Sequence, residues 1–237
     1  MQRDSSLKTS KRNLKRWANF IYVIAILSVG IWQLYKTSPA TVSDPRSIPA
    51  GTSPAAVALQ RLDIKGRAPK TGYSRLLFSN GWGEISACDL RNFVLARDMT
   101  SVTYVAGTCK VQSGVLADPY TGKAIEFTRG VGTSDDVQID HVVALGDAWQ
   151  KGAQQLTSAE RYALANDPLE LLAADGQANQ NKGDSDASTW LPPNKDYRCV
   201  YVAKQIAVKA KYRLWVTPAE YQAMAKILTS CPNQTLL

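Results

Sequence analysis

Histidine and cysteine are scarce in this sequence. It contains one histidine, His141, among 237 residues, and it has no G-x-S-x-G motif, so Ser-His-Asp hydrolysis receives no support. The four cysteines include no C-x-x-C pair, which disfavours a zinc ribbon or a thioredoxin-type site. Two disulfides are the simpler interpretation in an oxidising compartment. We expect them to join Cys88 to Cys109 and Cys199 to Cys231, because each pair lies within one local segment.

A large net charge is also lacking from most of the chain. The formal net charge is +8, but the first 36 residues contain seven Lys or Arg against Asp4 alone, so only +2 remains for the other 201 residues. The net charge therefore gives almost no evidence that the folded part binds a polyanion. Evidence for such binding must come from the local arrangement of its basic residues. With 45% hydrophobic and 20% charged residues, the chain can bury a real core.

The early charges precede an uncharged, apolar run. Residues 17–35 cover about the length that a bilayer core requires, and aromatic residues lie at both ends. Because residues 8–16 contain five Lys or Arg and only Lys36 follows the run closely, the positive-inside rule predicts a single-pass cell-membrane protein, with residues 1–16 as a cytoplasmic basic tail. A cleaved signal peptide, which would make the protein secreted, is the alternative, although the run is long and T-S-P-A-T is a poor cleavage site.

The rest of the chain is expected to lie outside the cytoplasm. Residues 36–54 are rich in Pro, Ser, Thr and Ala and are interpreted as an extended linker, which leaves residues 55–237 as one extracytoplasmic domain. Ser53 followed by Pro54 predicts a short helix through about Leu62.

Both halves of the domain carry local structural signals. Residues 73–130 mix short β-type runs with turn signals, which predicts a small antiparallel element. Capping boxes predict helices over residues 157–167 and 217–228. Between them, residues 201–215 form a third helix candidate, on which Lys204 and neighbouring basic residues share a face; a solvated charged stripe is the ordinary interpretation of such a face.

The surroundings of His141 first suggest a strand. Apolar and other residues alternate from Val137 to Leu145, which places Asp140 and His141 on opposite faces unless the strand ends, bulges or turns near them. By itself this spacing favours a structural histidine. Downstream, however, a turn, a short apolar strand over residues 169–174, a second turn and a polar helix start bearing Asn179 follow in order.

This order resembles the HNH, or His-Me finger, nuclease motif, in which a ββα unit grips one divalent metal. More narrowly, several segments between about Tyr73 and Pro232 resemble exported, actinobacterial-type proteins of the GmrSD restriction endonuclease C-terminal-domain family. The segments are CDLRN, DPYTG, EFTRG, IDHVVALGDAW, NDPLELLAADG, NQNKGD, WLPPN and VKAKYRLWVTPAE.

The resemblance implies a role for each matching residue. His141 would be the general base, and Asp140 and Asn179 would hold one divalent metal, Mg²⁺ or alternatively Mn²⁺. The chemistry agrees, because an imidazole can accept a proton near neutral pH and carboxylate and amide oxygens suit Mg²⁺. Glu170 stands where family members have an asparagine that helps to position the base, so Glu170 is expected either to bond the imidazole, to approach the metal or to weaken the site.

Basic side chains near this unit are candidates for phosphate contacts. Lys182, Arg198 and Lys204 are the residues expected to bind substrate, although a solvated face is the ordinary alternative.

The sequence therefore predicts an α+β fold: a ββα-metal core with a small antiparallel β element and flanking helices, preceded by one transmembrane helix. We expect a metal-dependent endonuclease that hydrolyses nucleic acid, DNA rather than RNA, with little sequence preference and with no protein partner. The alternative is a catalytically inactive, envelope-anchored binding module that keeps this fold; Glu170 motivates it.

Overall fold

The computed structural model describes residues 17, 22–28, 44–47 and 49–237. The chain divides into two compact units, Met1–Asp44 and Pro45–Leu237. The expected tail 1–16, most of the expected anchor 17–35, and residues 36–43 and 48 of the expected linker lie outside the described residues. Within the part that is described, no helix is long and apolar enough to cross a membrane.

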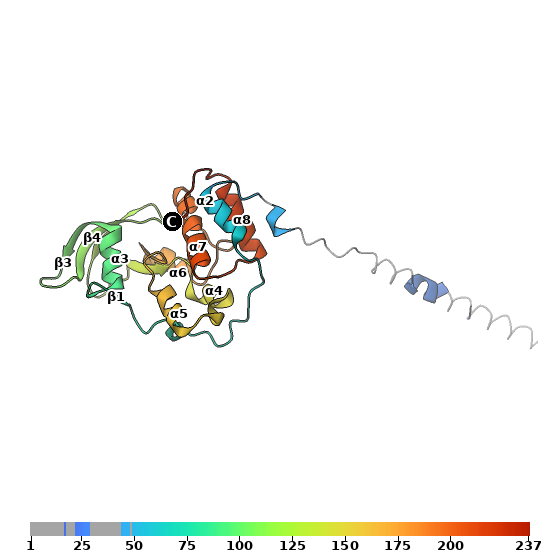
Figure 1. The fold of residues 1–237 in the computed structure, drawn as a ribbon, viewed down its shortest axis with the longest axis horizontal. Helices are drawn as coiled ribbons and strands as arrows, with labels where there is room; N and C mark the ends of the chain where they lie inside the picture. Colours follow the sequence, from blue (N-terminus) through green and yellow to red (C-terminus); the bar gives the residue numbers. More distant parts are fainter. Residues whose placement is uncertain (1–16, 18–21, 29–43, 48) are drawn as a thin grey trace, which may run out of the picture. The chain divides into compact units, whose positions relative to one another are not determined.

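The second unit is α+β, as predicted (Figure 1). Its α-helices are α2 (Pro54–Arg61), α3 (Leu90–Asp98), α4 (Leu145–Gln150), α5 (Ser158–Ala165), α6 (Gly176–Lys182), α7 (Arg198–Lys211) and α8 (Pro218–Leu228). Its strands are β1 (Glu84–Ile85), β2 (Cys88–Asp89), β3 (Met99–Tyr104), β4 (Val111–Ala117), β5 (Ala124–Thr128), β6 (Val137–His141) and β7 (Leu171–Asp175). Four 3-10 turns are η1 (Pro45–Ser47), η2 (Arg75–Leu77), η3 (Ala153–Gln155) and η4 (Lys195–Tyr197).

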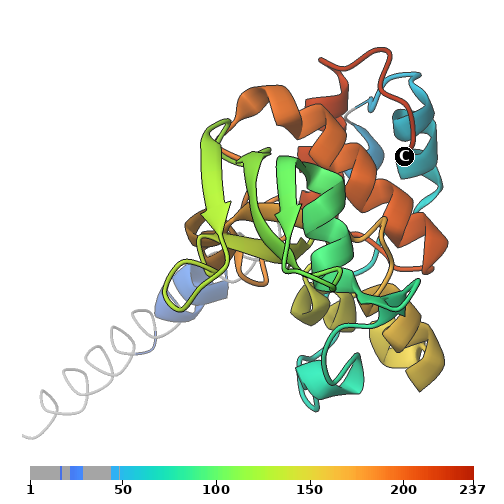
Figure 2. The same ribbon diagram turned by 90° about the vertical axis from the view of Figure 1, so that its left-hand side faces the viewer.

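The strands form three small antiparallel sheets. β1 pairs with β2, β3–β4–β5 form a meander, and β6 pairs with β7. The first five strands confirm the antiparallel element expected between residues 73 and 130. In Figure 2 the β3–β4–β5 sheet stands beside α3, while α7 crosses behind it.

Three helices, α2, α5 and α8, begin where the sequence predicts. Ser53 accepts a hydrogen bond from the amide of Ala56 with Pro54 at the first helical position of α2. Thr157 and Glu160 complete a capping box on α5, and Thr217 with Glu220 completes another on α8. Each of these side chains satisfies backbone amides that the first turn of a helix leaves without intrahelical partners.

The candidate helix 201–215 is only partly confirmed. α7 ends at Lys211, and Arg213 lies beyond it with a left-handed φ of 55° and an ion pair to Glu160. Lys211 pairs with Asp167, whereas Lys204 is half-buried. The expected basic face therefore does not form, because the helix stops before Arg213 and the cations bond different carboxylates.

The β6–β7 hairpin is buried on both faces. Val137, Ile139, Leu171 and Ala173 pack in one cluster with side chains of α3 and β4. Leu172 and Ala174 belong to another cluster, which contains the apolar faces of α2, α7 and α8. Figure 1 accordingly shows this hairpin and α6 between the β3–β4–β5 sheet and the helices α2, α7 and α8. Close packing on both faces restricts the movement of the β6–β7 strand pair.

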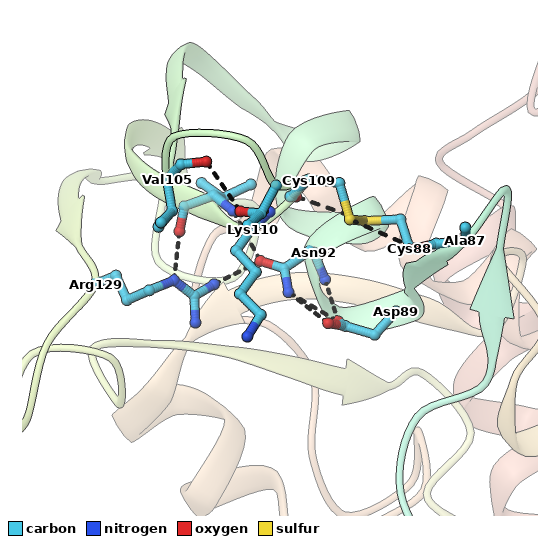
Figure 3. Close-up of a disulfide and its surroundings, with 10 residues drawn as sticks. Ala87, Cys88, Asp89, Asn92, Val105, Cys109, Lys110 and Arg129 are labelled. Carbon is cyan, nitrogen blue, oxygen red and sulfur yellow. Dashed lines mark hydrogen bonds between the residues drawn. A yellow bond between two sulfur atoms is a disulfide. The ribbon is translucent and has the colours of Figure 1, made fainter.

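Both expected disulfides form. Cys88 at β2 is bonded to Cys109 in the β3–β4 turn, and Cys199 in α7 is bonded to Cys231 after α8. Figure 3 shows the first one beside Asn92, which bonds both the Asp89 carboxylate and the amide of Val111. Each loop closure typically stabilises a fold by about 3 kcal/mol.

A group of mostly buried charged side chains links α4, α7 and α8. It also includes Arg67, which follows α2, and Asp186, which follows α6. Lys151 and Lys209 have 0% side-chain exposure, and both bond carboxylates of α4 and α8. We call this set the buried charge cluster; its members are Arg67, Asp147, Lys151, Asp186, Lys209 and Glu220. Three cations face three carboxylates, so the buried charges compensate one another.

Candidate active site

The strands β6 and β7 and the helix α6 form a ββα unit. His141 pairs with Leu171 and Asp140 with Leu172, and α6 starts directly after β7. Asp175 caps α6 by accepting a hydrogen bond from the amide of Ala178. A Cβ atom on Gly176 would lie 2.1 Å from the carbonyl oxygen of Asp135, so only glycine permits this close turn from strand to helix.

His141 is the last residue of β6, four residues earlier than the predicted end of the strand. The amide of Val142 donates to the carbonyl of Glu170, and α4 begins at Leu145. The imidazole Nε2 lies 2.9 Å from the carbonyl oxygen of Ala165 at the end of α5. Because a carbonyl only accepts hydrogen bonds, Nε2 carries the hydrogen and Nδ1 carries the lone pair.

The environment keeps this imidazole neutral. Burial, helped by the positive charge of Arg75, lowers the pKa of His141 to about 3 despite the raising effect of the Ala165 carbonyl. The ring of Trp82 stacks nearly parallel to the imidazole at a centroid distance of 5.9 Å. Neutral imidazole is the form that can accept a proton.

Two adjacent cavities meet at His141. One, of about 150 Å³, is lined by Ser79, Gly81, Trp82 and Ala165; the other, of about 220 Å³, is lined by residues of β6 and α6 that include Gln138 and Asn179. Arg75, His141 and Leu145 line both. The candidate site is therefore a small concave surface with the single histidine at its centre.

Asn179 lies where the sequence predicts, on α6 beside β6. Its Nδ2 donates to Oε1 of Gln138 at 2.8 Å, which holds the amide in the larger cavity. The amide oxygen of Asn179 can then serve as a hard donor for a cation.

Asp140 has different partners from those expected. One of its carboxylate oxygens accepts from Nζ of Lys182 at 2.9 Å, and the other accepts from the hydroxyl of Tyr120. Lys182 also donates to the carbonyl oxygen of His141 at 2.8 Å. Lys182 therefore links Asp140 to the end of β6 through two hydrogen bonds. It is buried and is not exposed for the expected phosphate contact.

Glu170 holds the turn after β6 and makes no hydrogen bond with the imidazole of His141. It has 0% exposure, and its Oε2 accepts from the amide of Val143 at 3.1 Å. Its other oxygen is one of the buried side-chain atoms without a hydrogen-bond partner among the described residues. Burial raises the pKa of Glu170 well above its usual range, which favours the protonated carboxyl. The expected hydrogen bond to His141 is not formed in this structure.

The other expected substrate contacts lie away from the cavities. Arg198 donates through Nε to the carbonyl of Pro192 at 2.8 Å. Lys204 is half-buried on α7, where burial and the charge of Arg97 lower its pKa. Neither residue lines the two cavities at His141.

The residues at this site offer few donors to a metal ion. Within the described part of the chain, no group of three or more His, Cys, Asp or Glu side chains is placed to hold a metal ion. The Asp140 carboxylate is already compensated by Lys182. Mg²⁺ commonly keeps several waters and is bound through one or two carboxylates together with substrate phosphates. Here the amide oxygen of Asn179, which lines the larger cavity, is the donor that is not engaged by a lysine.

Four residues that border or support the site were not identified from the sequence: Arg75, Trp82, Tyr120 and Gln138. Gln138 alternates with Asp140 in the strand pattern and could have been assigned to the Asn179 side of β6. Arg75, Trp82 and Tyr120 reach the hairpin through long-range packing, which no local spacing signals.

The unit β6–β7–α6 has the order of a ββα motif, and comparison with known proteins gives the class, a nuclease-related family. The family described as "GmrSD restriction endonucleases, C-terminal domain" matches residues 90–227. An "Uncharacterized secreted protein" of Arthroderma benhamiae is 39% identical over 197 residues, which cover 82% of this chain and 92% of the relative. No solved structure matches significantly. The chain belongs to the GmrSD C-terminal-domain family, as the sequence motifs predict.

Proposed function

We propose that this protein is a metal-dependent endonuclease that hydrolyses phosphodiester bonds, with DNA as the substrate and with low sequence specificity. The observation that carries the proposal is the hydrogen bond from His141 Nε2 to the carbonyl of Ala165, which leaves Nδ1 with the lone pair that can accept a proton. Two cavities meet at this histidine, and the family is nuclease-related. A small basic excess outside the first 36 residues argues against tight reading of a long sequence.

In the proposed reaction, Nδ1 of His141 accepts a proton from the attacking water. The water oxygen forms a bond to phosphorus as the bond to the leaving oxygen breaks, and the leaving oxygen takes a proton from solvent. Lys182 assists by donating to the His141 carbonyl. Asp140 accepts from Lys182 in turn, and the hydroxyl of Tyr120 donates to the other oxygen of Asp140. The imidazole is unprotonated across the neutral pH range, which is the form that accepts a proton, and its lowered pKa makes it a weak base.

The divalent metal, Mg²⁺ or Mn²⁺, belongs to this proposal through Asn179. When bound, such an ion supplies positive charge to the phosphate oxygens and to the leaving oxygen. Asp140 remains a candidate ligand only if Lys182 or Tyr120 releases one of its oxygens.

The site is proposed to work outside the cytoplasm. Two disulfides support an oxidising compartment, and the relative from Arthroderma benhamiae is described as secreted. The cytoplasmic tail 1–16, the anchor 17–35, the linker 36–54 and the domain 55–237 remain our proposed division of the chain.

The decisive test is plasmid nicking by the full-length protein with Mg²⁺ or Mn²⁺. We expect the wild type to nick DNA and His141→Ala to lose at least about 100-fold in rate, the lower range for a general base. EDTA should abolish the activity. Asn179→Ala should lower the rate, whereas Asn233→Ala, the same change at an exposed position after α8, should not. Equal nicking by wild type and His141→Ala would refute the proposal.

A second candidate function is an inactive binding module. Glu170 favours it, because a buried carboxyl with one unpartnered oxygen stands at the position of the family's asparagine. Titration of Mn²⁺ separates the two functions, since an inactive module need show no metal affinity that depends on Asn179.

A further inference from the structure

We propose that Arg75 is the phosphate-binding side chain of this site, contacting the non-bridging oxygens of the phosphodiester that His141 attacks. This inference rests on the proposed nuclease function and adds a substrate contact to it. Arg75 precedes residues 90–227, so it lies outside the segment that matches the family.

The first support is the position of Arg75 between the two cavities. Besides Arg75, only His141 and Leu145 line both of them. Leu145 is apolar, so Arg75 is the cationic side chain that reaches both cavities.

The second support is that Arg75 is available while neighbouring cations are not. Its side chain is exposed, and no ion pair within 4.0 Å joins it to a carboxylate of the described chain. Lys182 is buried against Asp140, and Lys70 lies 2.5 Å from the carboxylate of Asp184. A phosphodiester carries a single negative charge, which Arg75 can compensate without breaking an existing ion pair.

The third support is that the backbone around Arg75 is anchored although its side chain is exposed. Ser74 caps the short turn η2 by accepting from the amide of Leu76. Phe78 is 2% exposed and packs edge-on against Trp149, with ring centroids 6.3 Å apart. Arg161 donates to the carbonyl of Leu77 at 3.1 Å. The guanidinium therefore extends from a fixed point, which reduces the entropy lost on binding.

The chemistry of the guanidinium suits this role. Its planar fork can donate two parallel hydrogen bonds to two phosphate oxygens, whereas an ammonium acts as a point charge. Held beside His141, a phosphate bound in this way would present phosphorus to a water activated at Nδ1. Donors that meet charge developing in a transition state are worth about 100-fold or more in rate.

The single histidine provides a direct probe that does not require turnover. In full-length protein labelled at histidine, the imidazole signals seen by NMR belong to His141 alone. In EDTA, we expect dimethyl phosphate to shift these signals saturably in the wild type. Arg75→Gln should abolish the shift, Arg75→Lys should keep part of it, and Arg61→Gln, a matched change at an exposed arginine of α2, should keep all of it. Circular dichroism checks that each variant is folded.

Nicking kinetics complete the test and separate the two proposals. We expect Arg75→Gln to lower kcat about 100-fold, with partial recovery in Arg75→Lys and none of the loss in Arg61→Gln. If wild type nicks DNA but Arg75→Gln binds dimethyl phosphate and nicks normally, the Arg75 assignment is overturned and the nuclease proposal stands. If wild type does not nick DNA yet shows an Arg75-dependent shift, the phosphate site stands and the nuclease proposal fails. Absence of a saturable shift in the wild type overturns the phosphate site.

Discussion

At the scale of single residues, the site depends on how each polar atom near His141 is satisfied. The bond from Nε2 to Ala165 selects one tautomer, and Lys182 fixes the backbone at the end of β6. Glu170 is the exception, because one of its buried oxygens has no hydrogen-bond partner in the described part of the chain. A buried carboxyl of this kind costs free energy when it is ionised.

This gives a prediction for Glu170→Gln. Glutamine can still accept the hydrogen bond from Val143 but cannot ionise. The folded-state pKa of Glu170 is raised, so the wild type loses stability as the pH rises from the unfolded-state value toward the folded-state value. We expect Glu170→Gln to raise the free energy of unfolding by about 1 kcal/mol at pH 7, with a smaller gain near pH 4. Urea unfolding at both pH values measures this, and an equal effect at both would contradict the assigned titration.

The order of elements in the sequence predicts part of this site. His141 and Asn179 could be assigned because a strand, a second strand and an asparagine-bearing helix occur in order. The partners of Asp140 and Glu170 could not be assigned. Spacing tells which face of a strand a side chain occupies, but the choice between a metal, a lysine and a backbone amide depends on groups that distant segments bring to that face.

At the scale of elements, the ββα unit is supported by the buried charge cluster as well as by apolar packing. Lys151 follows α4 and bonds Asp147, Asp186 and Glu220, so it links α4 to α8 and to the loop after α6. The helix α4 begins four residues after His141 and supplies Leu145 to both cavities. Displacement of α4 would therefore disturb the site.

Removal of the central cation should be severely destabilising. Lys151→Met leaves buried carboxylates without one of their compensating charges, and we expect a loss of about 3–5 kcal/mol in the free energy of unfolding. Lys226→Met, at an exposed position of α8, is the matched control and should change stability by less than about 0.5 kcal/mol. Chemical unfolding followed by circular dichroism measures both. A loss below about 1 kcal/mol in Lys151→Met would mean that this cluster contributes little to stability.

Elements were more predictable than their ends. Local caps located α2, α5 and α8, because a capping side chain and its amide lie within one turn. The alternation around His141 predicted a strand as far as Leu145, but pairing ends at His141, since Glu170 uses its carbonyl and carboxylate to hold the amides of Val142 and Val143 in the following turn.

At the scale of the whole described domain, segments far apart in sequence complete the site. The Arg75 turn is anchored by Trp149 and Arg161, and Trp82 lies against His141. Trp82 is held through its neighbour Gly83, whose amide donates to Asn166 at 2.6 Å. Such contacts span about 60 to 80 residues and carry no periodic signal, which is why the sequence did not identify them.

The two disulfides stabilise different parts of this arrangement, and their burial predicts an order of reduction. Cys109 is exposed at the β3–β4 turn, whereas Cys231 is 6% exposed and belongs to the cluster formed by α2, α7 and α8. Because thiol–disulfide exchange requires access to a sulfur atom, a thiol reagent should reduce Cys88–Cys109 first. Cys199–Cys231 should be reduced more slowly, because Cys231 is buried and Cys199 is half-buried.

Timed alkylation and peptide mass spectrometry during reduction at neutral pH test this order. We expect Cys88 and Cys109 to be alkylated at least about 10-fold faster than Cys199 and Cys231, because access controls the exchange rate. A Cys88→Ala, Cys109→Ala variant should lose about 3 kcal/mol or less, and its remaining disulfide should stay protected. Simultaneous alkylation of all four cysteines would contradict this order. It would show that the β3–β4–β5 sheet and the packed helices α7 and α8 unfold as one cooperative unit.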